Sequence, residues 1–106
     1  MSGGSLPVNL VSFNGRIVNE NEVYLTWTTA SETNNKTFTV ERSMDAVNWV
    51  PVKIMNGAGT ATTTSVYAYT DVGLTTGIYY YRLKQTDISG ASTFSNIIGA
   101  KITGKD

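Results

Sequence analysis

Apolar residues recur at every second position along much of the 106-residue chain, in short runs separated by polar turns. Residues 23–27 and 79–83 carry the clearest runs. Because alternate side chains of a β-strand point to the same face, each run predicts a strand with one apolar face. Further runs of this kind predict about seven short strands in all, and polar or small residues at 31–36 and 56–64 predict loops between strands.

Three places depart from simple alternation. The apolar phase changes between Leu10 and Val11, which predicts a β-bulge or a strand that crosses between sheets. Asn14-Gly15 then predicts a turn or a bulge. Pro51 cannot donate a backbone hydrogen bond, so its strand is predicted to lie at a sheet edge or to contain a bulge.

The chain lacks a sustained 3.6-residue apolar pattern and is rich in β-branched residues, including sixteen threonines, which together predict an all-β protein. Short strands spaced about every 10–12 residues are typical of a seven-stranded antiparallel Greek-key β-sandwich. The predicted core residues are Leu10, Phe13, Val23, Leu25, Trp27, Phe38, Val40, Trp49, Ile54, Tyr69, Leu74, Tyr79, Tyr81, Leu83, Phe94 and Ile98.

Charge and missing residue types narrow the possible functions. Eight basic and eight acidic residues cancel, which leaves no electrostatic footprint for nucleic acid or an anionic membrane surface. No apolar run reaches the ~20 residues of a membrane-spanning helix, so membrane insertion is not expected. The chain has no cysteine and no histidine, which excludes cysteine nucleophiles, thiolate or imidazole zinc sites, and serine mechanisms with a histidine base.

Small and polar residues at both ends predict one folded domain between loose ends. Residues 1–5 predict a flexible leader or an expression scar, residues 6–103 a single domain, and residues 104–106 a loose C-terminus. A chain of this size usually forms one hydrophobic core. We expect it to be a domain taken from a longer protein.

The glutamates are the remaining candidates for catalysis, because glycoside hydrolysis uses two carboxyl groups about 5–10 Å apart across a cleft. Nothing in the sequence places Glu22, Glu32 and Glu41 as such a pair, and solvated surface positions are expected for them. We therefore predict no catalytic residues.

Three aspartates, Asp45, Asp71 and Asp87, border predicted turns. Their side chains are expected to accept hydrogen bonds from backbone groups two residues further along the chain. No spacing resembles a calcium-binding loop, so neither a metal site nor a cofactor is predicted.

Exposed aromatic side chains offer an alternative function. Tyr24 and Tyr80 alternate with apolar neighbours and are expected to point outward, and Trp49 lies near a turn. Such rings can stack on sugars, but aromatic pairs that pack across neighbouring strands give the same pattern. Tyr24, Trp49 and Tyr80 are therefore the candidate glycan-stacking residues of a carbohydrate-binding module.

Several segments resemble a fibronectin type III domain. The run at 23–27 resembles the second strand of that fold, and the run at 79–83 resembles its sixth strand. Tyr79 would then occupy the tyrosine-corner position, where the hydroxyl group reaches a nearby backbone group. The segment at 87–90 resembles the closing hairpin. The resemblance implies a β-sandwich of the fibronectin type III or immunoglobulin-like kind.

Longer stretches resemble a bacterial branch of this family. They are Leu6-Pro7-Val8-x-Leu10-x-Ser12-Phe13, Trp27-x-Thr29-Ala30-Ser31-Glu32-Thr33-Asn34-Asn35, Phe38-x-Val40-Glu41-Arg42-Ser43 and Tyr80-Tyr81-Arg82-Leu83-Lys84-Gln85-x-Asp87. Modules of this branch lie near the C-terminus of large proteins exported by the type IX secretion system. The resemblance, which covers about residues 6–103, implies a non-catalytic spacer or accessory module that is secreted or held at the cell surface. Its expected partners are the adjacent domains of the same polypeptide, or else a polysaccharide or another protein.

Overall fold

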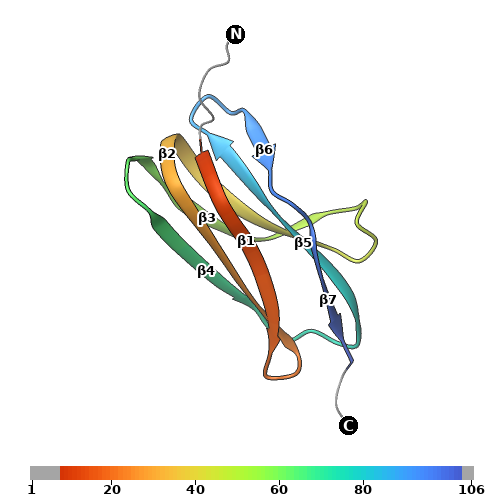
Figure 1. Cartoon of the computed structure of the whole chain (residues 1–106). Helices are drawn as coiled ribbons and strands as arrows, with labels where there is room; N and C mark the ends of the chain where they lie inside the picture. Colours follow the sequence, from red (N-terminus) through yellow and green to blue (C-terminus); the bar gives the residue numbers. More distant parts are fainter. Residues whose placement is uncertain (1–7, 104–106) are drawn as a thin grey trace.

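The computed structural model describes residues 8–103, and the runs of alternating apolar residues identified above lie in its strands (Figure 1). The strands in this range are β1 (Val8–Val18), β2 (Glu22–Ser43), β3 (Val50–Ala61), β4 (Ser65–Asp71), β5 (Gly77–Asp87), β6 (Ser92–Phe94) and β7 (Ile98–Ile102). The described range contains strands and no helix, so the all-β prediction is confirmed. It therefore contains no helix that could cross a membrane. The loose ends predicted at residues 1–5 and 104–106 lie outside the described residues.

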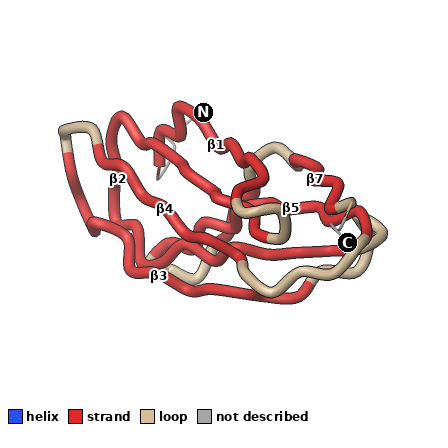
Figure 2. Tube along the Cα trace, turned by 90° about the horizontal axis from the view of Figure 1, so that it is seen from below, coloured by secondary structure: helices blue, strands red, loops and turns tan. Residues whose placement is uncertain are grey.

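The 22-residue strand β2 organises the sheet. Its first half pairs with β1 on one edge and with β4 on the other, and its second half pairs with β3 and β5. β5 then pairs with β6 and β7, so the seven strands of the described range belong to one antiparallel sheet. This sheet curls over on itself (Figures 1 and 2), and the buried apolar residues lie on its inner face.

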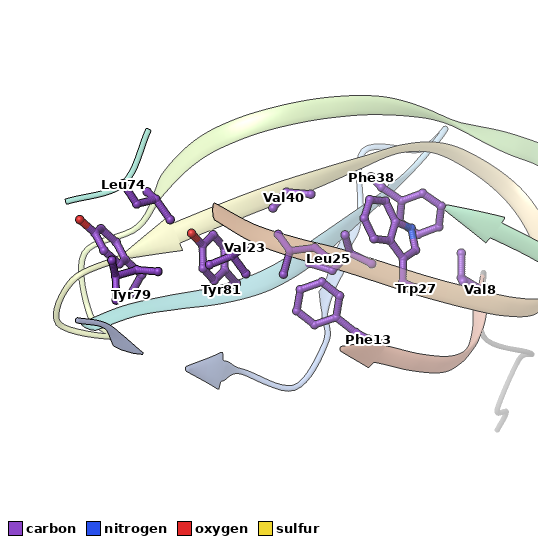
Figure 3. Close-up of a cluster of buried hydrophobic side chains, with 12 residues drawn as sticks. Val8, Phe13, Val23, Leu25, Trp27, Phe38, Val40, Leu74, Tyr79 and Tyr81 are labelled. Atoms are coloured by element: carbon purple, nitrogen blue, oxygen red, sulfur yellow. The ribbon is translucent and has the colours of Figure 1, made fainter. Parts of the chain in front are cut away.

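The core lies inside the curl and consists of the inward positions of the alternating strands. β2 contributes Val23, Leu25 and Trp27 from its first half, and Phe38 and Val40 from its second half. The other buried apolar residues are Val8, Phe13, Leu74, Tyr79, Tyr81, Leu83 and Ile102 (Figure 3). Because both halves of β2 face the same core, one continuous strand joins the two parts of the curled sheet.

Aromatic rings fill the centre of this core. The Trp27 indole lies parallel to the Tyr67 ring, with centroids 5.6 Å apart, and meets the Phe38 ring edge-on at 5.8 Å. Aromatic side chains of this size bury about 150–250 Å² each and dominate the energetics of a small core. The interior positions predicted for Trp27 and Tyr79 are confirmed.

Part of the predicted core is wrong. Ile54 is 62% exposed and Phe94 is 52% exposed, and Trp49 is only partly buried. The strand register explains this, because Ile54 pairs with Thr39 and Phe94 pairs with Lys84, both at outward-facing positions. The predicted residues Leu10, Tyr69 and Ile98 are partly buried against the core. The buried apolar residues absent from the predicted set are Val8 and Ile102.

Two predicted loops are largely extended chain. Residues 31–36 lie inside β2, and residues 56–61 form the last part of β3, so only residues 62–64 of the second predicted loop lie between strands. Asn14-Gly15 is also within a strand, where Gly15 pairs with Leu25. The polar composition of these segments suggested loops, but long-range pairing partners satisfy their backbone groups.

Two of the three predicted irregularities are confirmed, at Leu10 and at Pro51. The β1–β2 register shifts on both sides of Leu10, where the apolar phase changes. Pro51 lies in β3, which pairs with β2 at a register shift between Val40 and Glu41. A strand can accommodate a proline at such a point, because one backbone donor is already out of the regular ladder.

Candidate functional site

The most unusual chemical feature of the described residues is a cluster of polar side chains inside the β-sheet. Glu32 is only 1% exposed, and Asn35 and Gln85 are also buried. Glu32 and Asn35 lie where β2 leaves β1 and β4 and becomes the partner of β3 and β5, and the register shifts on both sides of Asn35. We call these three residues, with Thr29 and Tyr67, the Glu32 cluster.

The Glu32 carboxylate accepts four hydrogen bonds. Its Oε1 atom accepts from Asn35 Nδ2 at 2.7 Å and from the backbone N–H of Ala58 at 2.8 Å. Its Oε2 atom accepts from Thr29 Oγ1 at 3.0 Å and from the Tyr67 hydroxyl at 2.5 Å. These donors come from β2, β3 and β4, so a single carboxylate ties three strands together.

The hydrogen bonds continue from Asn35 toward the far edge of the sheet. Gln85 Nε2 on β5 donates to Asn35 Oδ1 at 2.8 Å, and Gln85 Oε1 accepts from Thr93 Oγ1 on β6 at 3.0 Å. The Asn35 amide is therefore held between Glu32 and Gln85, and the Gln85 amide is held between Asn35 and Thr93. Such fully satisfied chains can rigidify a core and fix one strand arrangement.

A glycine lets the backbone of β3 approach this cluster. A Cβ atom on Gly57 would lie 2.2 Å from Asn35 Nδ2 and 2.6 Å from Asn35 Cγ, so any side chain here would force Asn35 to move. The missing side chain brings the neighbouring N–H of Ala58 within reach of Glu32. Gly57 is the sequence signal that marks the site, since a glycine inside a strand often indicates a close backbone approach.

Burial and hydrogen bonding act in opposite directions on the pKa of Glu32. Burial alone raises this pKa, but the bonds from Asn35, Tyr67, Ala58 and Thr29 outweigh it and hold the pKa below the ordinary value of 4.5. The pKa of Tyr67 is raised to about 12, first by burial and then by its hydrogen bond to Glu32. At neutral pH the proton therefore stays on the phenol, and Glu32 is a carboxylate.

This arrangement is suited to holding strands together, because the donors to one carboxylate come from three strands. All four hydrogen bonds to the carboxylate come from neutral donors of the protein itself. Among residues 8–103, no group of three or more acidic side chains is placed to hold a metal ion. The surface position expected for Glu32 is wrong, since the side chain is buried. The local sequence does not indicate this burial, because its partners lie up to 35 residues away.

The other glutamates have simpler surroundings. Glu41 is partly buried and accepts a hydrogen bond from Arg82 Nε at 2.7 Å, across the β2–β5 pair. Glu22 is partly exposed and accepts a bond from Asn19 Nδ2 at 3.0 Å.

The aspartates divide into two kinds. Asp45 accepts from the backbone N–H groups of Val47 and Asn48, and Asp87 accepts from that of Ser89, so the predicted turn-capping role is confirmed for both. These bonds, led by the one from Asn48, hold the pKa of Asp45 well below its ordinary value.

The prediction for Asp71 is wrong. Asp71 is buried, and its Oδ2 atom accepts from Arg42 at 2.7 Å and from the Tyr81 hydroxyl at 2.6 Å. Burial, followed by the bond to Asp71, raises the pKa of Tyr81. The ion pair links β4 to β2 and the Tyr81 bond links β4 to β5, so Asp71 joins strands where a turn cap was expected.

The three candidate glycan-stacking residues do not form one platform. Tyr24 pairs with Arg16 on β1 and Thr70 on β4, whereas Tyr80 pairs with Gly99 on β7 in the other part of the curled sheet. Both side chains alternate with buried neighbours and point away from the core. Glycan binding by these residues remains a prediction.

Trp49 belongs to a separate stack on the outer surface. The Arg82 guanidinium carbon lies 4.3 Å from the centroid of the Trp49 ring and 4.1 Å from that of Phe94. Glu41 holds the same guanidinium through Nε. A guanidinium that packs on an aromatic ring covers one of the faces that a sugar would use, and cation–π contact of this kind stabilises an exposed site by about 0.5–1 kcal/mol.

A hollow of about 280 Å³ opens beside the end of the polar chain, between the start of β1 and β6. Phe38 and Leu83 line it together with Gln85 and Thr93. None of its lining residues is titratable, and both polar atoms of the Gln85 side chain are already engaged. The hollow therefore offers apolar surface and no acid or base.

Comparison with known proteins gives a fold and no family. No protein-family model matches the chain, and no curated protein sequence matches it. Among solved structures, the crystal structure of a β-1,2-glucanase from Parabacteroides distasonis is similar, with a TM-score of 0.66 and 20% sequence identity. The match covers 96% of this chain but 14% of the glucanase chain. At this identity, the similarity concerns the all-β fold alone.

Proposed function

We propose that this chain is a non-catalytic accessory module that lies in series between domains of a larger secreted or cell-surface protein and positions them. The observation that carries the proposal is the placement of its ends. β1 begins at one end of the molecule and β7 finishes at the other (Figure 1), and the long axis is 53 Å against 27 and 19 Å for the other two. A rigid body with entry and exit at opposite ends separates its neighbours by its own length.

The finer fold that we propose is a seven-stranded Greek-key β-sandwich of the fibronectin type III or immunoglobulin-like kind. Its support is the division of β2, which pairs with β1 and β4 first and with β3 and β5 afterwards. A second support is Tyr79, which is buried and donates its hydroxyl hydrogen to the Thr75 carbonyl at 2.8 Å. A tyrosine bonded to the backbone a few residues upstream is the tyrosine corner of such sandwiches.

Two further observations favour an accessory role. The similarity to a glucanase covers nearly all of this chain and a small part of that one, as expected for a unit that occurs within larger proteins. In addition, the buried carboxylates are engaged by protein donors, Glu32 by four of them and Asp71 by Arg42 and Tyr81. The motifs that resemble modules of type IX secretion substrates supply the proposed location, outside the cell or on its surface.

The proposal can be tested by measuring distances between spin labels on the two flanking domains of the longer polypeptide. We expect a narrow distance distribution in the intact protein. Replacing residues 8–103 with a Gly/Ser segment of equal length should broaden it, because such linkers behave as random coils. The activity of the flanking domains on small soluble substrates should be unchanged. A distribution that is already broad in the intact protein, or turnover of a substrate by the 106-residue chain, would contradict the proposal.

A further inference from the structure

A second hollow, of about 490 Å³, lies between the loop that joins β2 to β3 and the segment that joins β4 to β5. Met44, Val50 and Val72 line it, and each is more than half exposed. Leu74 and Tyr79 line it as well, at the end of the core opposite Trp27 (Figure 3). Three large apolar side chains are thus exposed around one hollow, where a partner could cover them together.

Hydrogen bonds hold the loop that presents this patch in one conformation. Ser43 Oγ accepts from the backbone N–H groups of Asp45 and Ala46, at 3.1 and 2.8 Å. The Asp45 carboxylate accepts from the next two backbone N–H groups and from Asn48 Nδ2. Met44 is thus exposed on a fixed backbone, and a partner that covers it does not need to order a flexible loop.

The hollow adjoins the point where the chain leaves the last strand. Gly77, at the start of β5, pairs with Ile102 at the end of β7, and a Cβ atom on Gly77 would lie 3.6 Å from Met44 Cε. Thr76 Oγ1 donates to the Thr103 carbonyl at 3.3 Å, next to the lining residue Thr75. Figure 1 shows the connection between β4 and β5 passing beside the end of β7.

We propose that this hollow is the docking surface for the domain that follows Thr103 on the same polypeptide. The inference rests on the proposed function and adds the face through which the module holds its neighbour. A domain tethered beside the hollow meets it at an effective concentration in the mM range, so even a small interface stays closed. Inter-domain interfaces are commonly small and partly polar. The lining has this mixed character, since Arg42 and Asn48 lie beside the apolar rim and are held in place by Asp71 and Asp45.

The test compares amide hydrogen exchange in the 106-residue chain and in the natural polypeptide that includes the following domain. We expect exchange in residues 44–50 and 72–75 to slow at least tenfold in the longer polypeptide. Met44→Ser and Val72→Ser together should abolish this protection. The matched control is Val66→Ser on β4, which alters an exposed valine that does not line the hollow and should leave the protection intact.

Each other outcome overturns the inference in a recognisable way. Equal exchange in the two polypeptides would show that the following domain does not dock here, while the narrow inter-label distances expected of a spacer could still hold. Protection that grows with the concentration of the 106-residue chain would assign the hollow to a second copy. If no domain follows Thr103 in the natural protein, both the inference and the proposed spacer role between domains fail.

Discussion

A buried carboxylate without a cation is normally costly, and Glu32 shows how residues of the same chain offset that cost. Transfer of an ion out of water costs several kcal/mol unless other groups replace its hydration. Here four donors do so, and each comes from an uncharged group. The cluster is therefore expected to depend on every atom of the carboxylate.

Glu32→Gln keeps the size of the side chain but turns one acceptor into a donor. Two of the four surrounding donors then face an N–H₂ group, and the charge that strengthens the other bonds is lost. We expect the free energy of unfolding to fall by about 1.5–3 kcal/mol, the range for hydrogen bonds to charged groups. Urea unfolding measures this loss. Glu22→Gln, at a partly exposed position, is the control and should change stability by less than about 0.5 kcal/mol.

Glu32 also makes the free energy of unfolding depend on pH. Because the folded-state pKa of Glu32 lies below its ordinary value of 4.5, its contribution to stability is fully present above about pH 5 and is lost as pH falls through the folded-state pKa. The stability difference between the parent protein and Glu32→Gln should therefore shrink between pH 5 and pH 2. Asp45 also has a lowered pKa, but it is present in both proteins and cancels in the difference. A difference that stays constant over this range would contradict an ionised Glu32.

The two tryptophans should respond very differently to truncation. Trp27→Ala removes a ring packed on Tyr67 and Phe38 and should cost about 3–5 kcal/mol, enough to unfold a marginal domain. Trp49→Ala loses contact with Arg82 near the surface and should cost only about 1 kcal/mol. Trp27 Nε1 is buried without a hydrogen-bond partner, so Trp27→Phe should cost less than half as much as Trp27→Ala. Thermal melts of the three variants give the order, and a Trp27→Ala variant that melts like the parent protein would refute this placement of the core.

At the scale of elements, local patterns predicted strands where side chains alternate and failed where polar residues have distant partners. The runs in β2 and β5 were recognisable because their apolar residues all face one core. Glu32 and Asn35 have the polarity of loop residues, and their burial depends in part on Tyr67 and Gln85, which lie far along the chain. Phe94 shows the opposite failure, since an apolar residue in an alternating run can still occupy the outward phase.

The close approach of β3 to β2 at Gly57 allows a direct test of the Glu32 cluster. Gly57→Ala would place a methyl group 2.2 Å from Asn35 Nδ2, so Asn35 must move and its bonds to Glu32 and Gln85 must lengthen or break. We expect a loss of about 1–3 kcal/mol, the usual cost of overpacking a filled site. Gly99→Ala is the control, because its methyl group would lie at an ordinary 3.6 Å from the Tyr80 ring. Equal unfolding midpoints for the two variants would show that the close approach is not needed.

At the scale of the whole molecule, the decisive feature is that one strand belongs to both parts of the curled sheet. β1, β3, β4 and β5 all pair with β2, and both halves of β2 face a common core. The part around β1 and β4 cannot unfold without exposing Trp27, which packs on Phe38 of the other half. The Glu32 cluster adds hydrogen bonds across the same junction.

Unfolding of the described domain should therefore be a single cooperative transition, as in most small domains. We expect urea curves from tryptophan fluorescence and from far-ultraviolet circular dichroism to coincide. The slowest-exchanging amides of β4 and β5 should report the same free energy, because both open only in the global reaction. Glu32→Gln should lower the opening free energies of the β4 and β5 amides equally if the Glu32 cluster joins the two halves of β2. Two separate transitions, or a loss confined to β4, would instead mean that the curled sheet consists of two parts that unfold independently.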